Sequence, residues 1–351
     1  MASVDLNQFG PKIEAPSRAA RESARDLLAR LAGPGQAWLG PAGAFEELAT
    51  WLAGVQGAGA GRRIERPKLL VFAGDHGVAG AGVSALPAGQ TVATVRDIAS
   101  GGGSIGALAR SVGAGVRVLD LTVDADLGDV LPPADVRYKV RRGSGRIDVD
   151  DAVTRVEAEQ AFLAGAAIAD DEVDSGADLL LATMVGVAAS TPAAVLTGVL
   201  TRSDAAAITG RGSGIDDAAW MRKCAIVRDA LRRARPLLAD QIALLAACGG
   251  ADFAAVAGFL LEAAVRRTPV IVDGLPATAA ALVGQRLGYR SVEWWLAAAS
   301  AGADPGLRKA LDRMGLTAVS DTGAKLGPGA AALLGLPLVR AAADLLATDD
   351  V

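Results

Sequence analysis

The stretch that decides the fold runs Val71-Phe-Ala-Gly-Asp-His-Gly-Val-Ala-Gly-Ala-Gly-Val-Ser-Ala-Leu-Pro87. It continues an apolar run that starts at Leu69 and ends at Ala73, with the length and branched side chains of a buried strand. A Gly-Asp-His-Gly turn follows, which neither a helix nor a strand tolerates. It contains His76, the only histidine of the chain. Because open α/β sheets bind ligands at the carboxyl ends of their strands, we expect a ligand site here, with His76 either contacting the ligand or supporting the loop.

Composition narrows the class of protein. Of 351 residues, 51% are hydrophobic but only 4% aromatic, so Ala, Val and Leu must build the core. Small side chains favour close packing of helices on a sheet, and 43 glycines suggest many tight turns. A net charge of −4 argues against a nucleic acid or an anionic membrane as partner. Two cysteines and one histidine predict neither a disulfide framework nor a metal site, and we expect no cofactor.

Predicted strands and helices alternate along the chain. Strands are expected at residues 69–73, 116–121, 179–182, 206–209 and 269–273. Helices are expected at residues 18–31, 45–55, 91–99, 105–111, 150–175, 192–200, 241–248, 253–267, 275–286, 307–314 and 333–346, after residue 215, and around Trp294 and Trp295. This alternation predicts an α/β fold with a Rossmann-like, doubly wound, mostly parallel sheet and a small helical subdomain.

The sequence predicts a cytoplasmic protein. Residues 1–30 contain no apolar segment typical of an export signal. The stretch 179–200 carries no charge and is long enough to cross a bilayer. Ser190-Thr-Pro192 interrupts it near the middle, which favours a buried strand, a glycine-containing loop and a buried helix instead. We therefore expect no membrane partner.

A dinucleotide-binding pattern occurs in the wrong context. Gly101, Gly103 and Gly106 satisfy G-x-G-x-x-G, and Asp120 follows at nearly the distance at which an acidic residue holds the ribose. The pattern should open a helix directly after a strand. Residues 95–100 look helical instead, so an NAD-dependent enzyme is the weakest of the functional hypotheses.

Short glycine loops are candidates for phosphate binding. They lie at residues 74–82, 101–103, 186, 210–214 and 327–329. Backbone N–H groups in such loops bind phosphate, above all beside the amino terminus of a helix. Lys223, one or two turns into the helix after the loop at 210–214, could supply a fixed positive charge. A surface lysine explains it equally well from spacing alone.

Specific motifs extend over nearly the whole chain. Two of them, Gly74-Asp-His-Gly-Val78 and Gly212-Ser-Gly-Ile-Asp-Asp217, are highly specific. The first of them lies within a matching segment at residues 71–87. Further matching segments lie, in order, at residues 100–126, 139–145, 222–223, 249–252, 266–274 and 326–327 with 329. On these motifs the chain resembles the nicotinate-nucleotide:dimethylbenzimidazole phosphoribosyltransferases, which build the lower ligand of cobalamin.

The resemblance implies a fold and a reaction. The fold would be a Rossmann-like α/β domain at residues 61–330 and a helical subdomain at 1–60, completed by the C-terminal helices, including 331–351, usually in a dimer. In that family an azole nitrogen attacks C1′ of nicotinate mononucleotide and displaces nicotinate, while a glutamate takes the azole proton. The leaving group departs neutral from a pyridinium, so no metal ion is needed to offset its charge.

Several substrate-binding positions of the family are retained. They are Asp75, His76, Ser84, Gly186, Lys223, Gly327 and Gly329. The resemblance implies that Lys223 and the loops around Gly186 and Gly327 hold the phosphate of the mononucleotide.

Other positions depart from the family. Pro328 occupies the place of the glutamate base in Leu-Gly-Glu-Gly, so no catalytic residue is intact there. Leu86 replaces a tyrosine of the azole wall, and Ala93 replaces a glutamine of the same pocket. The family's Met-Gly-Ile-Gly-Asn-Thr-Thr loop becomes Met184-Val-Gly-Val-Ala-Ala-Ser-Thr191, and residues 299–307 have lost most of a His-Arg-Ser-x-Glu-Pro-Gly-His segment.

We therefore predict phosphoribosyl transfer from nicotinate mononucleotide to a benzimidazole-type base, in assembly of the cobamide nucleotide loop. The activity is expected to be weakened or altered because Pro328 cannot accept a proton. The alternative is a catalytically silent paralogue that pairs with an active family subunit. The expected partners are thus the two small-molecule substrates and either a second copy of the chain or such a paralogue.

Overall fold

The structure, a computed structural model, describes residues 8–32, 43–299, 302, 304–323 and 326–348. Within these residues, one parallel sheet has six strands in the order β2-β1-β3-β4-β5-β6. The strands are β1 (Pro67–Gly74), β2 (Gly115–Thr122), β3 (Leu179–Val185), β4 (Val270–Val272), β5 (Trp295–Ala299) and β6 (Ala318–Ser320). The predicted α/β, Rossmann-like fold class is confirmed.

The centre of the sheet fixes where a ligand can bind. β1 and β3 are almost wholly apolar and buried, and they pair in parallel with Val71 opposite Thr183. The chain adds β2 on one side of β1 and all later strands on the other side. The direction of winding therefore reverses between β1 and β3. In such sheets, ligands bind in the crevice beyond the carboxyl ends of the strands at this point.

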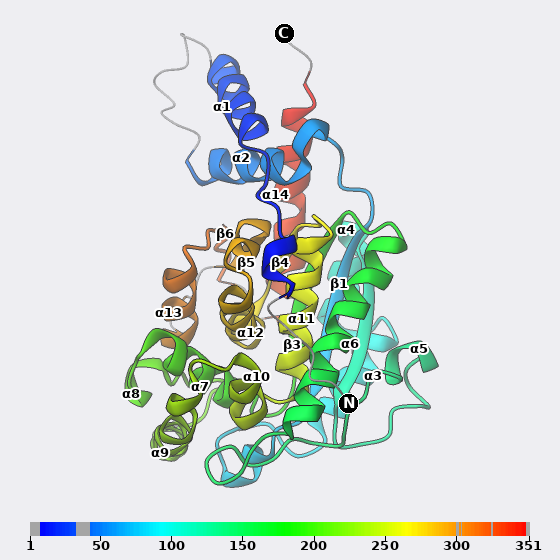
Figure 1. The fold of residues 1–351 in the computed structure, drawn as a ribbon. Coiled ribbons are helices and arrows are strands. Elements are labelled where there is room, and N and C mark those ends of the chain that lie inside the picture. Colours follow the sequence, from blue (N-terminus) through cyan, green and yellow to red (C-terminus); the bar gives the residue numbers. More distant parts are fainter. Residues whose placement is uncertain (1–7, 33–42, 300–301, 303, 324–325, 349–351) are drawn as a thin grey trace.

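Helices cover both faces of the sheet (Figure 1). The near face carries α6 (Arg155–Asp174), α11 (Ala251–Val265) and α12 (Gly274–Leu287), and the far face carries α3 (Gln90–Ala99), α4 (Gly103–Val112) and α14 (Ala330–Leu346). Glycines bring α6 and α11 very close together. A Cβ on Gly165 would lie 1.8 Å from the carbonyl oxygen of Ala255, and one on Gly258 would lie 2.0 Å from that of Phe162. Small residues thus permit the close packing that the composition predicts.

Other helices lie outside these two layers. α1 (Arg18–Ala32) and α2 (Ala44–Gln56) pack on each other, and α2 packs on α14, at the top of Figure 1. The remaining helices are α5 (Pro133–Val136), α7 (Ser190–Thr201), α8 (Ala205–Ile208), α9 (Asp217–Ala234), α10 (Gln241–Leu244) and α13 (Pro305–Met314). The domain boundaries at residues 60/61 and 330/331 stay a prediction.

Two predicted elements are wrong, and one is missing. Residues 206–209 are not a strand, because α8 occupies most of them and its three alanines are the best helix formers. Trp294 and Trp295 do not lie in an α-helix. A 3₁₀ turn ends at Trp294 and β5 begins at Trp295, in keeping with the preference of aromatic residues for strands. β6 has only half-buried side chains and no apolar run that would predict it.

The uncharged stretch 179–200 folds as predicted, into β3, a loop and α7. Over the described ranges, no helix is long and apolar enough to cross a membrane.

Candidate functional site

The glycine pattern at 101–106 does not form a dinucleotide site. Its glycines lie in the turn between α3 and α4 and at the start of α4, not directly after a strand. Asp120 is fully buried, and its carboxylate accepts hydrogen bonds from Lys139 Nζ at 2.8 Å and from the N–H of Val123 at 3.0 Å. A ribose cannot reach this carboxylate, so the geometry argues against the NAD-dependent hypothesis.

His76 supports the loop after β1. Its side chain is buried, its Nε2 lies 3.1 Å from Oδ2 of the fully buried Asp252, and its ring packs edge-on against Phe253. The imidazole and the carboxylate are close but not aligned for a hydrogen bond. Because these contacts bury the ring, the supporting role is favoured over direct contact with a ligand.

Asp75 links the loop after β1 to the loop after β3. Its Oδ1 accepts a hydrogen bond from Thr91 Oγ1 at 2.5 Å, and the same hydroxyl oxygen accepts the N–H of Val187 at 3.0 Å. The neighbouring Gly186 lies so close to β1 that a Cβ would be 2.0 Å from the carbonyl oxygen of Gly74. Two residues predicted from the sequence, Asp75 and Gly186, therefore meet at the point where the winding of the sheet reverses.

Lys223 is not a surface residue. Its side chain is fully buried, and its Nζ donates to Ser190 Oγ at 2.9 Å and to the carbonyl oxygen of Gly210 at 3.1 Å. Ser190 opens α7, so the ammonium group lies at the amino terminus of that helix. The loop that carries Gly186 leads directly into the same helix. The surface-lysine alternative is therefore wrong.

The surroundings of Lys223 suit an anion. Burial lowers the pKa of Lys223 to about 8, against smaller opposing effects of Asp304 and Cys224. Both hydrogen-bond acceptors of its ammonium group are neutral. A buried cation without a bonded carboxylate is costly to keep, and the first N–H groups of a helix add partial positive charge. These features together favour a bound phosphate.

Ser84 joins the loop after β1 to the loop before α9. Its Oγ lies 3.2 Å from Ser213 Oγ, which also accepts the N–H of Ala85 at 2.8 Å. Leu86, in the same loop, is 43% exposed. Hydrogen bonds at Ser84 and Ala85 thus fix this loop against the loop before α9. The side chain of Leu86 remains accessible to a ligand.

The loop from Gly327 to Gly329 is held by other elements. Its two glycines have φ angles of +105° and +90°, which other residues rarely adopt. Ser104 Oγ, in α4, donates to the carbonyl oxygen of Leu326 at 2.5 Å, and a Cβ on Gly329 would lie 3.0 Å from Leu69. Pro328 is exposed. These contacts run to α4 and β1 rather than to Lys223, so that a common phosphate site stays a prediction.

A carboxylate that sequence reasoning did not single out holds the end of this loop. Asp273 directly follows β4, is 8% exposed, and accepts the N–H of Ala332 at 3.1 Å as well as those of Ala331 and Gly329. Burial raises the pKa of Asp273 to about 6, although the three N–H groups act in the opposite direction. Its position at the end of the predicted strand 269–273 is the signal that could have identified it.

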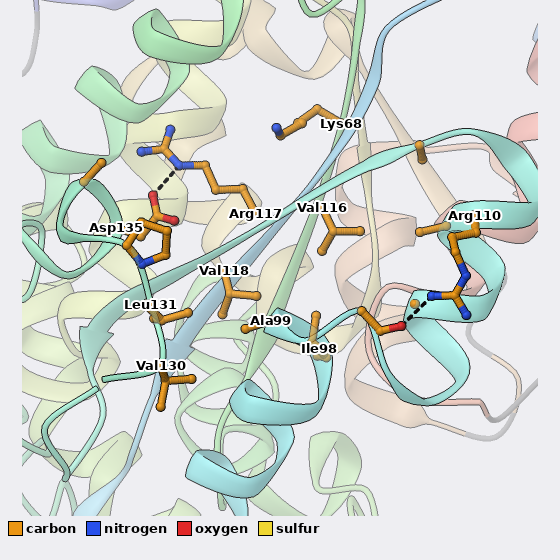
Figure 2. Close-up of a pocket in the computed structure, with 16 residues that line it drawn as sticks. Lys68, Ile98, Ala99, Arg110, Val116, Arg117, Val118, Val130, Leu131 and Asp135 are labelled. Carbon is orange, nitrogen blue, oxygen red and sulfur yellow. Dashed lines mark hydrogen bonds and ion pairs between the residues drawn. The ribbon is translucent and has the colours of Figure 1, made fainter. Parts of the chain in front are cut away.

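A separate cavity of about 570 Å³ lies beside β2, where Val116 and Val118 line it (Figure 2). Arg117 also lines it, but its guanidinium donates to Asp135 at 2.7 Å and to Glu172 at 2.8 Å and is thus neutralised. Of the glycine loops predicted to bind phosphate, only the one at 101–103 contributes to the described lining, through Gly101, and none of the substrate-binding positions implied by the resemblance does. This cavity is therefore distinct from the candidate site.

Within the described ranges, no group of three or more His, Cys, Asp or Glu side chains is placed to hold a metal ion. That the reaction needs no metal stays a prediction.

Comparison with known proteins identifies the family. Residues 13–349 match a family described as phosphoribosyltransferase. The chain belongs to this family. It is 51% identical over 348 residues to the nicotinate-nucleotide–dimethylbenzimidazole phosphoribosyltransferase of Streptomyces avermitilis, a match that covers 99% of this chain and 91% of that protein. The resemblance inferred from the motifs is thus confirmed.

Two further phosphoribosyltransferases support this assignment. The nicotinate-nucleotide–dimethylbenzimidazole enzyme of Streptomyces coelicolor is 49% identical over 348 residues, which cover 99% of this chain and 96% of that protein. The solved structure of the corresponding protein from Thermus thermophilus is similar with a TM-score of 0.83 at 33% identity, covering 94% of this chain and 96% of that chain.

Proposed function

We propose that this chain transfers the phosphoribosyl group of nicotinate mononucleotide to a benzimidazole-type base, in assembly of the cobamide nucleotide loop. Relatives at 51% and 49% identity carry the name of this activity. The observation that carries the proposal is the buried ammonium group of Lys223 at the amino terminus of α7, which suits the phosphate of a mononucleotide.

Charge explains the recognition of the phosphate. A phosphate monoester carries nearly two negative charges at neutral pH, and Lys223 supplies one fixed cation. Hydrogen bonds to charged groups are worth about 1.5–3 kcal/mol each. The dipole of α7 adds partial positive charge at its amino terminus. The loops around Gly186 and Gly327 supply backbone close to the ligand. Asp75 contributes by fixing the loop of Gly186.

The transfer exchanges one C–N bond for another. The lone pair of an azole nitrogen attacks C1′, and the bond between C1′ and the pyridinium nitrogen breaks. The electron pair of the broken bond stays on the ring nitrogen of nicotinate, which thereby becomes neutral. The azole then loses its N–H proton. Pro328 stands where the family has its glutamate base and cannot take this proton. General-base assistance is worth about 10²–10⁴-fold, so the chain is expected to be slow rather than inactive.

The same proline motivates a second candidate function. A chain that binds nucleotide but lacks its base could serve as the silent member of a dimer with an active family subunit. We also propose that the chain forms a dimer, either with a second copy of itself or with such a paralogue. We further propose that it is located in the cytoplasm.

Incubation of the pure chain with nicotinate mononucleotide and a panel of azoles tests the proposal, with chromatography of free nicotinate as the readout. We expect slow release that depends on the azole. Lys223→Ala should weaken nucleotide binding about tenfold or more, whereas Lys309→Ala, at an exposed lysine of α13, should not. Nucleotide binding without any release would instead support the silent-partner function. Unchanged nucleotide affinity in Lys223→Ala would place the phosphate elsewhere.

A further inference from the structure

Helix α14 is capped by a residue far away in the sequence. Its N-cap residue, Gly329, has no side chain that could accept the first N–H groups of the helix. The carboxylate of Asp273 accepts them instead, although it precedes Ala332 by 59 residues. A Ser, Thr, Asp or Asn at the N-cap position would satisfy the helix locally. The distant cap does more, because it ties the loop before α14 to the end of β4.

This arrangement is costly in two respects. Asp273 brings a carboxylate into a site that is 8% exposed, where desolvation opposes its ionisation. The loop needs positive φ angles at Gly327 and Gly329, which are strained for any other residue. Ionisable groups with strongly perturbed pKa values cluster at functional sites. The exposed Pro328, at the position of the family's base, lies between the two glycines.

We propose that Asp273 is a positioning residue: its ionised carboxylate holds the loop from Gly327 to Gly329 in the conformation that receives the substrates. The proposal rests on the proposed function, because it treats this loop as part of the substrate site. Asp273 acts through the backbone of the loop and does not itself touch the reacting atoms.

Only the ionised form of Asp273 can play this role. A carboxylate has acceptors alone, whereas a protonated carboxyl group turns a donor toward one of the N–H groups and loses its attraction to the helix amino terminus. Burial raises the pKa of Asp273 to about 6, and no charged side chain of the described residues shifts it. The side chains that reach this loop from β1, β3 and α4, namely Leu69, Thr183 and Ser104, are uncharged. Because this pKa is raised above the ordinary value of 3.8, the folded chain holds the proton of Asp273 more tightly than an opened loop does, so acid does not open the loop. Replacement of the carboxylate, and not its titration, therefore tests its role.

Amide hydrogen exchange of the unliganded chain tests the clamp without any substrate. Corrected for intrinsic exchange, the protection of Ala331 and Ala332 at pH 7 is expected to be about tenfold lower in Asp273→Asn than in the wild-type chain, because the negative charge and one acceptor oxygen are lost. Asp273→Ala, which removes both acceptor oxygens, should lower this protection further. Asp240→Asn is a matched control, since Asp240 caps α10 by accepting the N–H of Ala243. Wild-type protection of Ala331 and Ala332 in Asp273→Asn overturns the proposal, even if Asp273→Ala fails to fold.

Turnover tests the link to the substrates. The Asp273 variants and the wild-type chain are compared at pH 7.5, with kcat measured at saturating substrates and stability measured by urea denaturation. In Asp273→Asn, kcat per folded molecule is expected to be at least about tenfold lower, whereas a purely structural role would leave kcat per folded molecule unchanged. Wild-type kcat and KM in Asp273→Asn overturn the proposal. If the wild-type chain neither binds nucleotide nor releases nicotinate, the proposed function is wrong. Hydrogen exchange still shows in that case whether Asp273 holds the loop.

Discussion

Replacing Lys223 by methionine should separate the function of the residue from its effect on stability. A shift of its pKa from 10.5 to about 8 corresponds to about 3 kcal/mol by which folding disfavours the ammonium form. Methionine has a similar length and no charge. It leaves Ser190 Oγ and the carbonyl oxygen of Gly210 without their donor, at about 1 kcal/mol each. We expect Lys223→Met to raise the free energy of unfolding at pH 7 by about 1 kcal/mol and to weaken nucleotide binding at least about tenfold.

The pH dependence provides an independent check. Between pH 8 and 10.5 the unfolded wild-type chain binds more protons at residue 223 than the folded chain does, so the free energy of unfolding rises with pH in this window. Lys223→Met cannot show this rise. Urea denaturation from pH 7 to 10.5 measures stability, and calorimetry with nicotinate mononucleotide measures affinity. A methionine variant that is clearly less stable and binds the nucleotide normally would refute the reasoning.

Three further predictions concern the loops and the chemistry. The chain is expected to turn over about 10²-fold more slowly than a Glu-bearing relative, and Pro328→Glu should recover part of this loss. If Pro328→Glu binds nucleotide but is no faster, the silent-partner function is favoured. Gly186→Ala should abolish nucleotide binding and destabilise the chain, because its Cβ would lie 2.0 Å from the carbonyl oxygen of Gly74; normal calorimetry and normal urea denaturation of this variant would contradict the packing. A chelator should not change turnover, and loss of activity on chelation would show that the reaction needs a metal ion.

The central strands could be predicted because their sequence signals agree. Residues 69–73 and 179–182 are short apolar runs with polar residues or turns beside them, and both became buried strands. Residues 295–299 lack such a signal, because a run rich in alanine fits a helix as well as a strand. Its pairing with β4, which places Leu296 opposite Ile271, decides the outcome. Such pairing depends on tertiary structure and is not visible in a local window.

Some residues of the candidate site could also be predicted from the sequence, and others could not. Asp75 and Gly186 could be found because they follow strands at the carboxyl edge of the sheet. The burial of Lys223 could not, since it depends on how α9 packs against α7. The hydrogen bond from the N–H of Ala332 to Asp273 joins residues 59 positions apart, so no local pattern predicts it. Motif resemblance identified the family, but it did not show which of the matching residues are buried supports.

Identification of the product tests the central claim most directly. The chain is incubated with nicotinate mononucleotide and a benzimidazole, and the mixture is analysed by mass spectrometry. Transfer predicts a new N-glycoside of the base with ribose 5-phosphate, formed in equal amount with nicotinate and at least about a hundredfold more slowly than with a Glu-bearing relative. Nicotinate accompanied by free ribose 5-phosphate would mean hydrolysis, and bound nucleotide without any glycoside would mean a silent chain; either result would contradict the account.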